Sequence, residues 1–396
     1  MDSLSAVIFV PDDTSKTGYP QPLMLQRVLG APLLAWLADA MFDSGVGRFF
    51  LVCRERFAEA ACACLPAEAE VTTAADSNPS DLLHVFLSTA NESEREITIV
   101  AGPAVYVPSL ARRSGAPLSS CVRRADRVAL MAALDDNASF IQFLSEQCAV
   151  LSDYDGYFSV DTPAAALSLA KLLQRDRALR LMKQGVEVVD PDNCYIEPTV
   201  RIASGVRLLP GTILRGRTVV DADAVIGPWS TVENARIGEG AVVACSQLSD
   251  VSVGRGCTVG PYAHLRPGTV LEAGAKIGSF VEVKNAHIGE NTWASHLSYL
   301  GDADIGSGCN IGCGAATVNF DRAEKHRTTI GDDAFIGCNV SLVAPLKVGN
   351  GAYIAAGSTV TEDVPEQALG IARARQSNKK DWAAKHKLKE PKKETK

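Results

Sequence analysis

A hydrophobic residue returns at every sixth position in three long runs, and this period constrains the fold more than any other feature. The runs are Ile196, Ile202, Leu208, Leu214, Val220, Ile226 and Val232; Val253, Val259, Leu265, Leu271, Ile277 and Val283; and Ile330, Ile336, Leu342, Val348, Ile354 and Val360. Six residues match neither a helix nor a continuous strand, but they fit one short strand plus one tight turn. Three such sides close a triangular coil whose repeated aliphatic residues stack inside. The sequence therefore predicts a left-handed parallel β-helix over residues 190–365.

The period is interrupted in two places. One interruption lies between His296 and Ile305, and a longer one spans Val318–Thr329. A solenoid accommodates extra residues as loops on one face, and such loops often carry binding groups. We therefore expect functional side chains near these two segments.

The first 160 residues have a different pattern. Ala6–Val10, Phe49–Cys53 and Glu96–Ala101 read as strands, and Pro32–Asp43 has the apolar spacing of a helix. This order predicts an α/β domain with a parallel sheet over residues 1–160. Thr162-Pro163 is a helix-start signal and Gly185 a stop signal, so residues 161–189 should form a connecting helix.

The C-terminal end is polar and basic. Eight lysines fall between Lys379 and Lys396, and Trp382 lies among them. A run of this kind is typical of a solvated, frayed tail, which we assign to residues 366–396.

Composition restricts the class of protein. The 396 residues carry a formal net charge of −7, with 46% hydrophobic and 21% charged residues. An acidic balance argues against a nucleic-acid partner, and no apolar run is long enough to cross a bilayer. The N-terminus lacks a basic segment before its short apolar stretch, so we expect a cytoplasmic protein without a membrane partner.

Neither cysteines nor histidines suggest a metal site. The 11 cysteines are scattered, and the close pairs Cys62/Cys64 and Cys309/Cys313 lack the matching partners of a zinc ribbon. They read as free thiols in a reducing compartment. No two of the six histidines have the spacing expected for ligands on adjacent coils, so we predict no metal.

One part of the solenoid gathers residues suited to chemistry. They are Arg266, Glu282, Lys284, His296, Tyr299, Asn310, Asn319 and Lys325. Arginine and lysine suit a phosphate, histidine beside a carboxylate suits a general base, and asparagine and tyrosine suit hydroxyl groups. Each alone could be an ordinary surface residue, but stacked coils would bring the set together.

The same region resembles a known family. The segments 265–268 (LRPG), 278–284 (GSFVEVK) and 295–306 (SHLSYLGDADIG) are similar to the acetyltransferase half of the bacterial GlmU family. That family is bifunctional, with N-acetylglucosamine-1-phosphate uridyltransferase and glucosamine-1-phosphate N-acetyltransferase activities. The close match spans about residues 253–380, and a looser one reaches back to about 162.

The resemblance implies roles for the gathered residues. His296 would be the general base that takes a proton from the sugar amine as it attacks acetyl-CoA, and Glu282 would orient that histidine. Substrate-binding residues would be Arg266, Lys284, Tyr299, Asn310 and Lys325. Acetyl-CoA-binding residues would be Asn319, Phe320, Cys313, Cys338, Ala356 and Arg373.

This chain departs from the family at some of these positions. The family usually has tyrosine at position 320, and cysteine is a mild departure at positions 313 and 338. The family is a homotrimer with sites built from neighbouring chains and a C-terminal segment that reaches across. A solenoid without covering helices has surface to bury, which agrees with that assembly.

The N-terminal part departs more strongly. The resemblance implies a Rossmann-like nucleotidyltransferase domain, with a glycine-rich loop after the first strand that cradles phosphates. Here that stretch is 7–23 (VIFVPDDTSKTGYPQPL), where Pro11 removes a donor and Asp12 and Asp13 add negative charge. A family metal-binding Asp is replaced in Ala101-Gly102-Pro103, and the family's metal-binding Asn is missing from 156–159 (GYFS). Mg²⁺ is therefore expected only if uridyl transfer survives.

These observations predict a glucosamine-1-phosphate N-acetyltransferase with acetyl-CoA as co-substrate and a degenerate N-terminal domain. Its product would enter UDP-N-acetylglucosamine synthesis, which supplies peptidoglycan and lipopolysaccharide. Three alternatives stay open: an enzyme that retains uridyl transfer, an acetyltransferase for another amino-sugar, and a non-catalytic trimeric scaffold.

Overall fold

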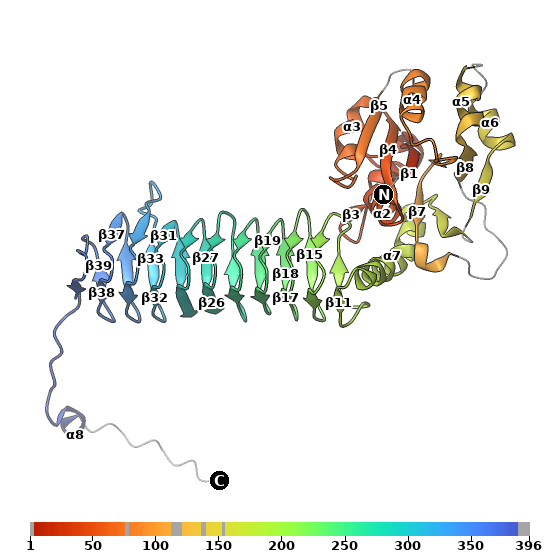
Figure 1. The fold of residues 1–396 in the computed structure, drawn as a ribbon. Coiled ribbons are helices and arrows are strands. Elements are labelled where there is room, and N and C mark those ends of the chain that lie inside the picture. The colour runs from red at the N-terminus through yellow and green to blue at the C-terminus, as the bar shows by residue number, and fades with distance from the viewer. Residues whose placement is uncertain (1–3, 76–78, 112–120, 136–139, 153–154, 387–396) are drawn as a thin grey trace, which may run out of the picture.

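The chain forms a globular α/β domain followed by a long prism of stacked coils (Figure 1). The structure, a computed structural model, describes residues 4–75, 79–111, 121–135, 140–152 and 155–386. The last ten residues of the predicted tail therefore lie outside the described part. Among the described helices, none has the length and apolar character needed to cross a membrane.

The N-terminal domain is built on a six-stranded sheet of order β5-β4-β1-β6-β8-β9. Its strands and those of two small sheets are β1 (Leu4–Phe9), β2 (Arg27–Val28), β3 (Ala31–Pro32), β4 (Val46–Cys53), β5 (Glu70–Ala75), β6 (Glu96–Val100), β7 (Ala104–Tyr106), β8 (Val122–Asp126), β9 (Ala149–Leu151) and β10 (Tyr157–Ser159). The α-helices of the described residues are α1 (Thr14–Thr17), α2 (Leu33–Asp43), α3 (Glu55–Cys62), α4 (Pro79–Ser88), α5 (Arg127–Asp135), α6 (Phe140–Glu146), α7 (Pro163–Lys183) and α8 (Trp382–Lys385).

The predicted α/β domain is confirmed, with one difference in its sheet. Strands β5, β4, β1 and β6 pair in parallel as expected, but β8 and β9 add an antiparallel edge. Alternation along β1 buries both faces of the sheet. Ile8 packs with α2 and α3, and Val7 packs with α4 and α5. The sheet is therefore mixed, because the chain returns through β8 and β9 before it reaches α7.

Three parallel sheets form the prism, and each coil contributes one strand to each sheet. The β11 sheet contains β11 (Glu187–Val188), β14 (Arg207–Leu208), β17 (Val225–Ile226), β20 (Val242–Val243), β23 (Thr258–Val259), β26 (Lys276–Ser279), β29 (Trp293–His296), β32 (Asn310–Ile311), β35 (Phe335–Ile336), β38 (Tyr353–Ile354) and β40 (Leu369–Gly370). The β12 sheet contains β12 (Tyr195–Ile196), β15 (Ile213–Arg215), β18 (Thr231–Glu233), β21 (Gln247–Ser249), β24 (His264–Leu265), β27 (Glu282–Lys284), β30 (Tyr299–Gly301), β33 (Ala316–Val318), β36 (Ser341–Val343) and β39 (Thr359–Val360). The β13 sheet contains β13 (Arg201–Ile202), β16 (Val219–Val220), β19 (Arg236–Ile237), β22 (Ser252–Val253), β25 (Val270–Leu271), β28 (His287–Ile288), β31 (Ala303–Ile305), β34 (Thr328–Ile330) and β37 (Leu346–Val348).

The predicted left-handed β-helix is confirmed, and the repeated aliphatic residues form its core. Leu208 and Ile226 face each other across adjacent coils, and both side chains are fully buried. The ladders extend slightly beyond the expected limits of 190 and 365, because β11 and β40 pair with the coils beside them.

The two interruptions of the period have different structures. Between His296 and Ile305 the ladder continues through β30 and β31, with Leu300 opposite Val283 and Ile305 opposite Ile288. The second interruption is a true insertion: Ile305 pairs with Ile330, and residues 319–327 leave the coil between β33 and β34. We call residues 319–327 the inserted loop.

Helix α7 joins the two parts and packs against both. Its Thr162 N-cap accepts a hydrogen bond from the backbone N–H of Ala165, at 3.2 Å. Ala170 and Leu173 pack with the N-terminal domain, whereas Ala178 and Leu181 belong to the core of the β-helix. The helix is therefore a shared wall rather than a free linker.

Candidate functional site

The turn that connects each β11-sheet strand to the following β12-sheet strand forms a straight line of stacked residues, which we call the first corner. One column of this corner has left-handed backbone geometry. It contains Trp229, Cys245, Tyr262, Phe280, Leu297, Gly314, Asn339 and Gly357. Backbone hydrogen bonds join successive coils here, such as Gly314 N–H to the Leu297 carbonyl, at 2.8 Å.

The column just before it contains the predicted catalytic histidine and three predicted acetyl-CoA residues. His296, Cys313, Cys338 and Ala356 each precede a left-handed residue, so they occupy equivalent positions on four successive coils. The strand pairs Ala294–Ile311 and Ile311–Ile336 set this register. The structure therefore places these four residues, far apart in the sequence, in one line.

Side-chain size along the first corner changes at His296. On the N-terminal side the left-handed column has large exposed residues, including Tyr262 and Phe280, whose rings stack with centroids 5.5 Å apart. Beyond Leu297 the same column has Gly314, Asn339 and Gly357. The side chains of this column are therefore mostly bulky before His296 and smaller after Leu297, and we call the turns after Leu297 the open part of the first corner.

A group of polar residues lies on the adjacent outer face of the β12 sheet. Arg266 follows β24, Glu282 and Lys284 lie on β27, and Tyr299 lies on β30. Register places Glu282 directly beside Tyr299. An Arg266 Nη1–H donates to Glu282 Oε1, at 2.7 Å. Four of the predicted site residues are thus gathered by strand pairing alone.

The inserted loop brings two more of these residues to the same face. Asn319 Nδ2 donates to the hydroxyl of Tyr299, at 3.4 Å, and to the carboxylate of Asp302. Lys325 lies close to Lys284: hydrogen bonding and repulsion between the two amines, together with partial burial, lower the pKa of Lys284. Arg266 adds to this effect and Asp302 opposes it. The result is a local excess of positive charge that suits a phosphate.

A set of interactions anchors the inserted loop to the coil. Arg327 binds the Asp304 carboxylate through two nitrogens and donates to the carbonyl oxygens of Asn285 and Ala303, both at 3.2 Å. Within the loop, the His326 N–H donates to the Asn319 carbonyl, at 2.8 Å. Sequence reasoning did not single out Arg327, although a basic residue next to an insertion signal was visible.

Two predicted site residues lie elsewhere. Asn310 is on the outer face of the β11 sheet, between Trp293 and Phe335, and does not face the β12-sheet group of its own chain. Phe320 is in the inserted loop and is exposed. Among the described residues, the His296 ring makes no hydrogen bond, and the side chain of Glu282 is paired with Arg266.

The loop after β1 contains a short helix and two carboxylates with partners of their own. Residues 14–17 form the short helix α1, and its flanking carboxylates bind the protein's own groups. Asp12 pairs with Arg56 at 2.6 Å, and Asp13 accepts the Leu23 N–H at 3.0 Å. A hydrogen bond from Thr14 and the nearby Arg56 lower the pKa of Asp12.

The structure also reveals an ionic network that sequence reasoning missed, at the junction of α2, α7 and the first coils. Arg180 contacts Asp39 at 2.8 Å, Asp176 at 2.9 Å and also Asp43. Arg177 donates to the carbonyl of Val200, at 2.9 Å, and lies within 3.3 Å of Asp39.

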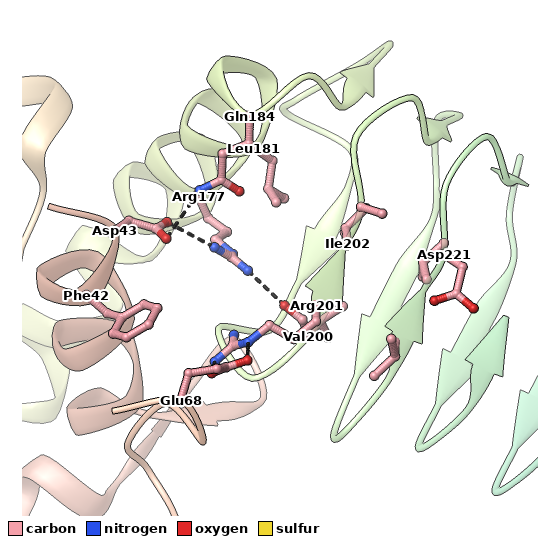
Figure 2. A pocket seen from close by; sticks show the side chains of 13 residues that line it. Phe42, Asp43, Glu68, Arg177, Leu181, Gln184, Val200, Arg201, Ile202 and Asp221 are labelled. Carbon is pink, nitrogen blue, oxygen red and sulfur yellow. Dashed lines mark hydrogen bonds and ion pairs between the residues drawn. The ribbon is translucent and has the colours of Figure 1, made fainter. Parts of the chain in front are cut away.

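A cleft of about 450 Å³ opens beside this network (Figure 2). Asp43 and Arg177 point toward each other across it, and Glu68 meets Arg201 at 3.1 Å. The available signal in the sequence was a pair of acidic residues, Asp39 and Asp43, on an otherwise apolar helix.

The comparisons with known proteins find one family model that matches two parts of the prism. Residues 250–285 and 327–362 match the family described as "Bacterial transferase hexapeptide (six repeats)". Among solved structures, LpxA from Acinetobacter baumannii matches with 17% identity and a TM-score of 0.24, covering 45% of this chain and 71% of LpxA.

Among curated proteins, the chain is similar to several with the name "Bifunctional protein GlmU". It is 45% identical over 270 residues to the protein from Brevibacillus brevis, covering 65% of this chain and 58% of that protein. Identity to the protein from an Exiguobacterium species is 50% over 218 residues, covering 55% and 48%, respectively. Identity to the protein from Thermoanaerobacter pseudethanolicus is 37% over 304 residues, covering 74% and 64%. The resemblance to GlmU is thereby confirmed, and this chain spans about half to two-thirds of these relatives' length.

Proposed function

We propose that this chain is a glucosamine-1-phosphate N-acetyltransferase that uses acetyl-CoA. The observation that carries the proposal is the first corner, which lines up His296 with Cys313, Cys338 and Ala356 beside a cationic face. The similarity to proteins named "Bifunctional protein GlmU" supports the same reaction.

The sugar phosphate would bind on the outer face of the β12 sheet. Lys284 and Lys325 lie side by side there, with Arg266 next to them. Arginine offers a planar fork and lysine a compact charge, so the three suit a phosphate monoester. Tyr299 and Asn319 would contact sugar hydroxyl groups from the adjacent coil and the inserted loop.

Acetyl-CoA would lie along the open part of the first corner. Its thioester would be near His296, and the rest of the molecule would extend past Cys313, Cys338 and Ala356 toward Arg373. A Cβ added at Gly357 would meet the Arg373 side chain at 3.7 Å, so this arginine is at the far end of the line. Asn319 and Phe320 would flank the acetyl group.

The reaction needs no bond between the enzyme and the acetyl group. The neutral sugar amine attacks the thioester carbon, an N–C bond forms, and the C–S bond breaks to release the CoA thiolate. His296 takes the proton from the amine and returns it to the leaving sulfur. General-base catalysis of this kind contributes about 10²–10⁴-fold. Glu282 accepts a hydrogen bond from Arg266, so in the proposed site it would orient both Arg266 and His296.

A homotrimer would explain the position of Asn310. This residue faces away from the β12-sheet group of its own chain, so it would reach a substrate only at a site shared with a neighbouring copy. The tail residues 374–386 are exposed along their described length, which leaves them available to such a neighbour. The cytoplasmic location predicted from the sequence stays a prediction.

The N-terminal domain would have lost uridyl transfer. The pairing of Asp12 with Arg56 and of Asp13 with the Leu23 N–H supports this part of the proposal, because negative charge occupies the loop where phosphates would bind. Retained uridyl transfer would instead require Mg²⁺ and nucleotide binding at this loop.

A paired assay tests the proposal. Thiol release from acetyl-CoA with glucosamine-1-phosphate is measured beside pyrophosphate release from UTP with N-acetylglucosamine-1-phosphate. We expect the first activity alone, with kcat about 10²–10⁴-fold lower in His296→Ala and unchanged thermal unfolding. Arg266→Ala should mainly raise KM for the sugar phosphate. Pyrophosphate release would contradict the proposed loss of uridyl transfer. Thiol release only with other amines would contradict glucosamine-1-phosphate as the substrate. The absence of activity in both assays would favour a non-catalytic scaffold.

A further inference from the structure

Cys313 and Cys338 occupy equivalent positions on adjacent coils of the first corner. Their strands are in register on both sides, since Ile311 pairs with Ile336 and Ala316 pairs with Ser341. The Asn339 N–H donates to the Cys313 carbonyl, at 2.7 Å, which fixes the two turns against each other. The inserted loop leaves from a different corner of the same coil, so it does not disturb this register.

This stacking brings the two thiols within bridging range. Adjacent coils are separated by the usual strand spacing of about 4.8 Å, and disulfides form between Cα atoms roughly 4.4–6.8 Å apart. Because the two residues occupy equivalent positions in turns held in register, we expect both side chains to leave the corner on the same side. Their Cβ atoms must approach by about 1 Å to reach the mean disulfide separation of about 3.8 Å, so the bond would be readily reducible.

The thiols are also accessible. Cys338 is exposed and Cys313 is half-buried. By contrast, Cys62 and Cys64 are close in sequence but directed to different partners: the Cys64 thiol donates to the Ala60 carbonyl, and the Cys62 sulfur contacts the Thr73 hydroxyl. Burial also raises the pKa of Cys64 to about 12, which suppresses its thiolate.

We propose that Cys313 and Cys338 form a reversible intrachain disulfide that blocks the open part of the first corner. The bond formation is independent of the proposed acetyltransferase activity, whereas its effect on acetyl-CoA binding rests on that proposed function. It makes the first corner a thiol-modification site one coil away from His296.

The oxidant is a low-molecular-weight disulfide such as oxidised glutathione. The Cys338 thiolate attacks one of its sulfurs, so a mixed disulfide forms and one small thiol leaves. The Cys313 thiolate then attacks the Cys338 sulfur, and the second small thiol leaves. Two protein thiols are oxidised to one disulfide, one small disulfide is reduced to two thiols, and the two protons pass to the released thiols.

Thiol counting on the full-length native protein tests bond formation without reference to activity. After treatment with oxidised glutathione and removal of the reagent, we expect two fewer titratable thiols and a mass lower by two hydrogens. Peptide mapping should find the Cys313–Cys338 cross-link, and dithiothreitol should restore both thiols. Cys313→Ala should instead retain one glutathionyl group at Cys338.

Cys245 provides a matched control, because it lies on the same corner but has Trp229 and Tyr262 as its neighbours in the stack. Cys245→Ser should form the cross-link like the unmodified sequence. No loss of the two thiols, a cross-link between other cysteines, or a linkage between two chains on a non-reducing gel would each overturn the proposal.

Activity is the second readout. A misplacement of about 1 Å near a reaction centre can cost on the order of 10²-fold, so the oxidised protein should have kcat/KM for acetyl-CoA at least about tenfold lower. Dithiothreitol should reverse the loss, and Cys338→Ala, whatever its basal activity, should show the same kcat/KM before and after treatment with the oxidant. If thiol release is absent even from the reduced protein, the proposed function fails and the thiol count still decides the disulfide. If the cross-link forms and activity is unchanged, the blocking effect is overturned.

Discussion

At the scale of single residues, the cationic group on the β12 sheet is assembled from two neighbouring strands and a loop that is distant in sequence. Arg266 and Lys284 come from adjacent strands, and Lys325 comes from the inserted loop. A hydrogen bond with Lys325, followed by repulsion from that amine, lowers the pKa of Lys284. Proteins keep like charges this close mainly where a ligand of opposite charge compensates them.

Replacement of Lys325 by methionine should relieve this repulsion. We expect the pKa of Lys284 to rise toward the ordinary lysine value of about 10.4, and KM for the sugar phosphate to increase. An NMR titration of the lysine side chains measures the pKa, and Lys347→Met on the β13 sheet serves as the control. An unchanged Lys284 pKa in Lys325→Met would contradict the pairing. Glucosamine-1-phosphate itself should raise that pKa in the unmodified protein.

At the scale of elements, local patterns predicted most of the fold. The expected strand Glu96–Ala101 is β6 (Glu96–Val100), and the expected helix Pro32–Asp43 is α2 (Leu33–Asp43). The six-residue period fixed the coils because each side must bury one aliphatic residue. The antiparallel pairing of β8 with β6 was not predicted, since sheet order depends on contacts between distant segments.

For the candidate site too, the sequence period predicts one part, and the rest depends on contacts between distant segments. Strand register alone aligns His296 with Cys313 and Cys338, so the period contains that information once the coils are known. The six-residue period did not predict the contacts of Arg327, because the partners of an inserted loop are determined only in the folded coil. The proposed role of Asn310 could not be derived from one chain, since its contact with substrate would need a second copy of the chain.

Replacement of Arg327 by glutamine should loosen the inserted loop without unfolding the coil. Exposed ion pairs contribute roughly 0.2–1 kcal/mol, so KM for the sugar phosphate should rise by up to about fivefold while Tm stays unchanged. Arg322→Gln in the same loop is the control, and an equal effect of both variants would refute a specific anchor.

The pH dependence of this effect has a defined sign. The hydrogen bond from Arg327 lowers the pKa of Asp304 below its unfolded value. The stabilisation is therefore complete above the ordinary carboxyl pKa of about 3.9 and is lost only as the pH falls through the lowered folded value. The ratio of KM values between Arg327→Gln and the unmodified protein should thus stay constant from about pH 6 to pH 8.

At the scale of the whole molecule, the junction network joins an α/β domain to a solenoid that could otherwise bend relative to it. Asp39 and Asp43 come from α2, Arg177 and Arg180 from α7, and Val200 from the turn before the β13 sheet. Asp39, Arg177 and Arg180 are buried. Because charged groups removed from water depend on one another, the network ties three elements into one unit.

Replacement of Arg180 by methionine should break that unit. Removal of one member of a buried ionic group costs about 3–5 kcal/mol, since its partners keep their charge without compensation. We expect the first transition in thermal unfolding to move to a clearly lower temperature, and limited proteolysis to cut at α7. Arg175 provides the control on the same helix: its pair with Asp192 is exposed, so Arg175→Met should change stability by less than about 1 kcal/mol. Equal unfolding temperatures for Arg180→Met and Arg175→Met would mean that the apolar contacts of α7 alone hold the two domains together. Acetyl transfer at neutral pH should persist in Arg180→Met at temperatures below the transition, because His296 and Cys313 lie at β29 and after β32, several coils along the prism from the network.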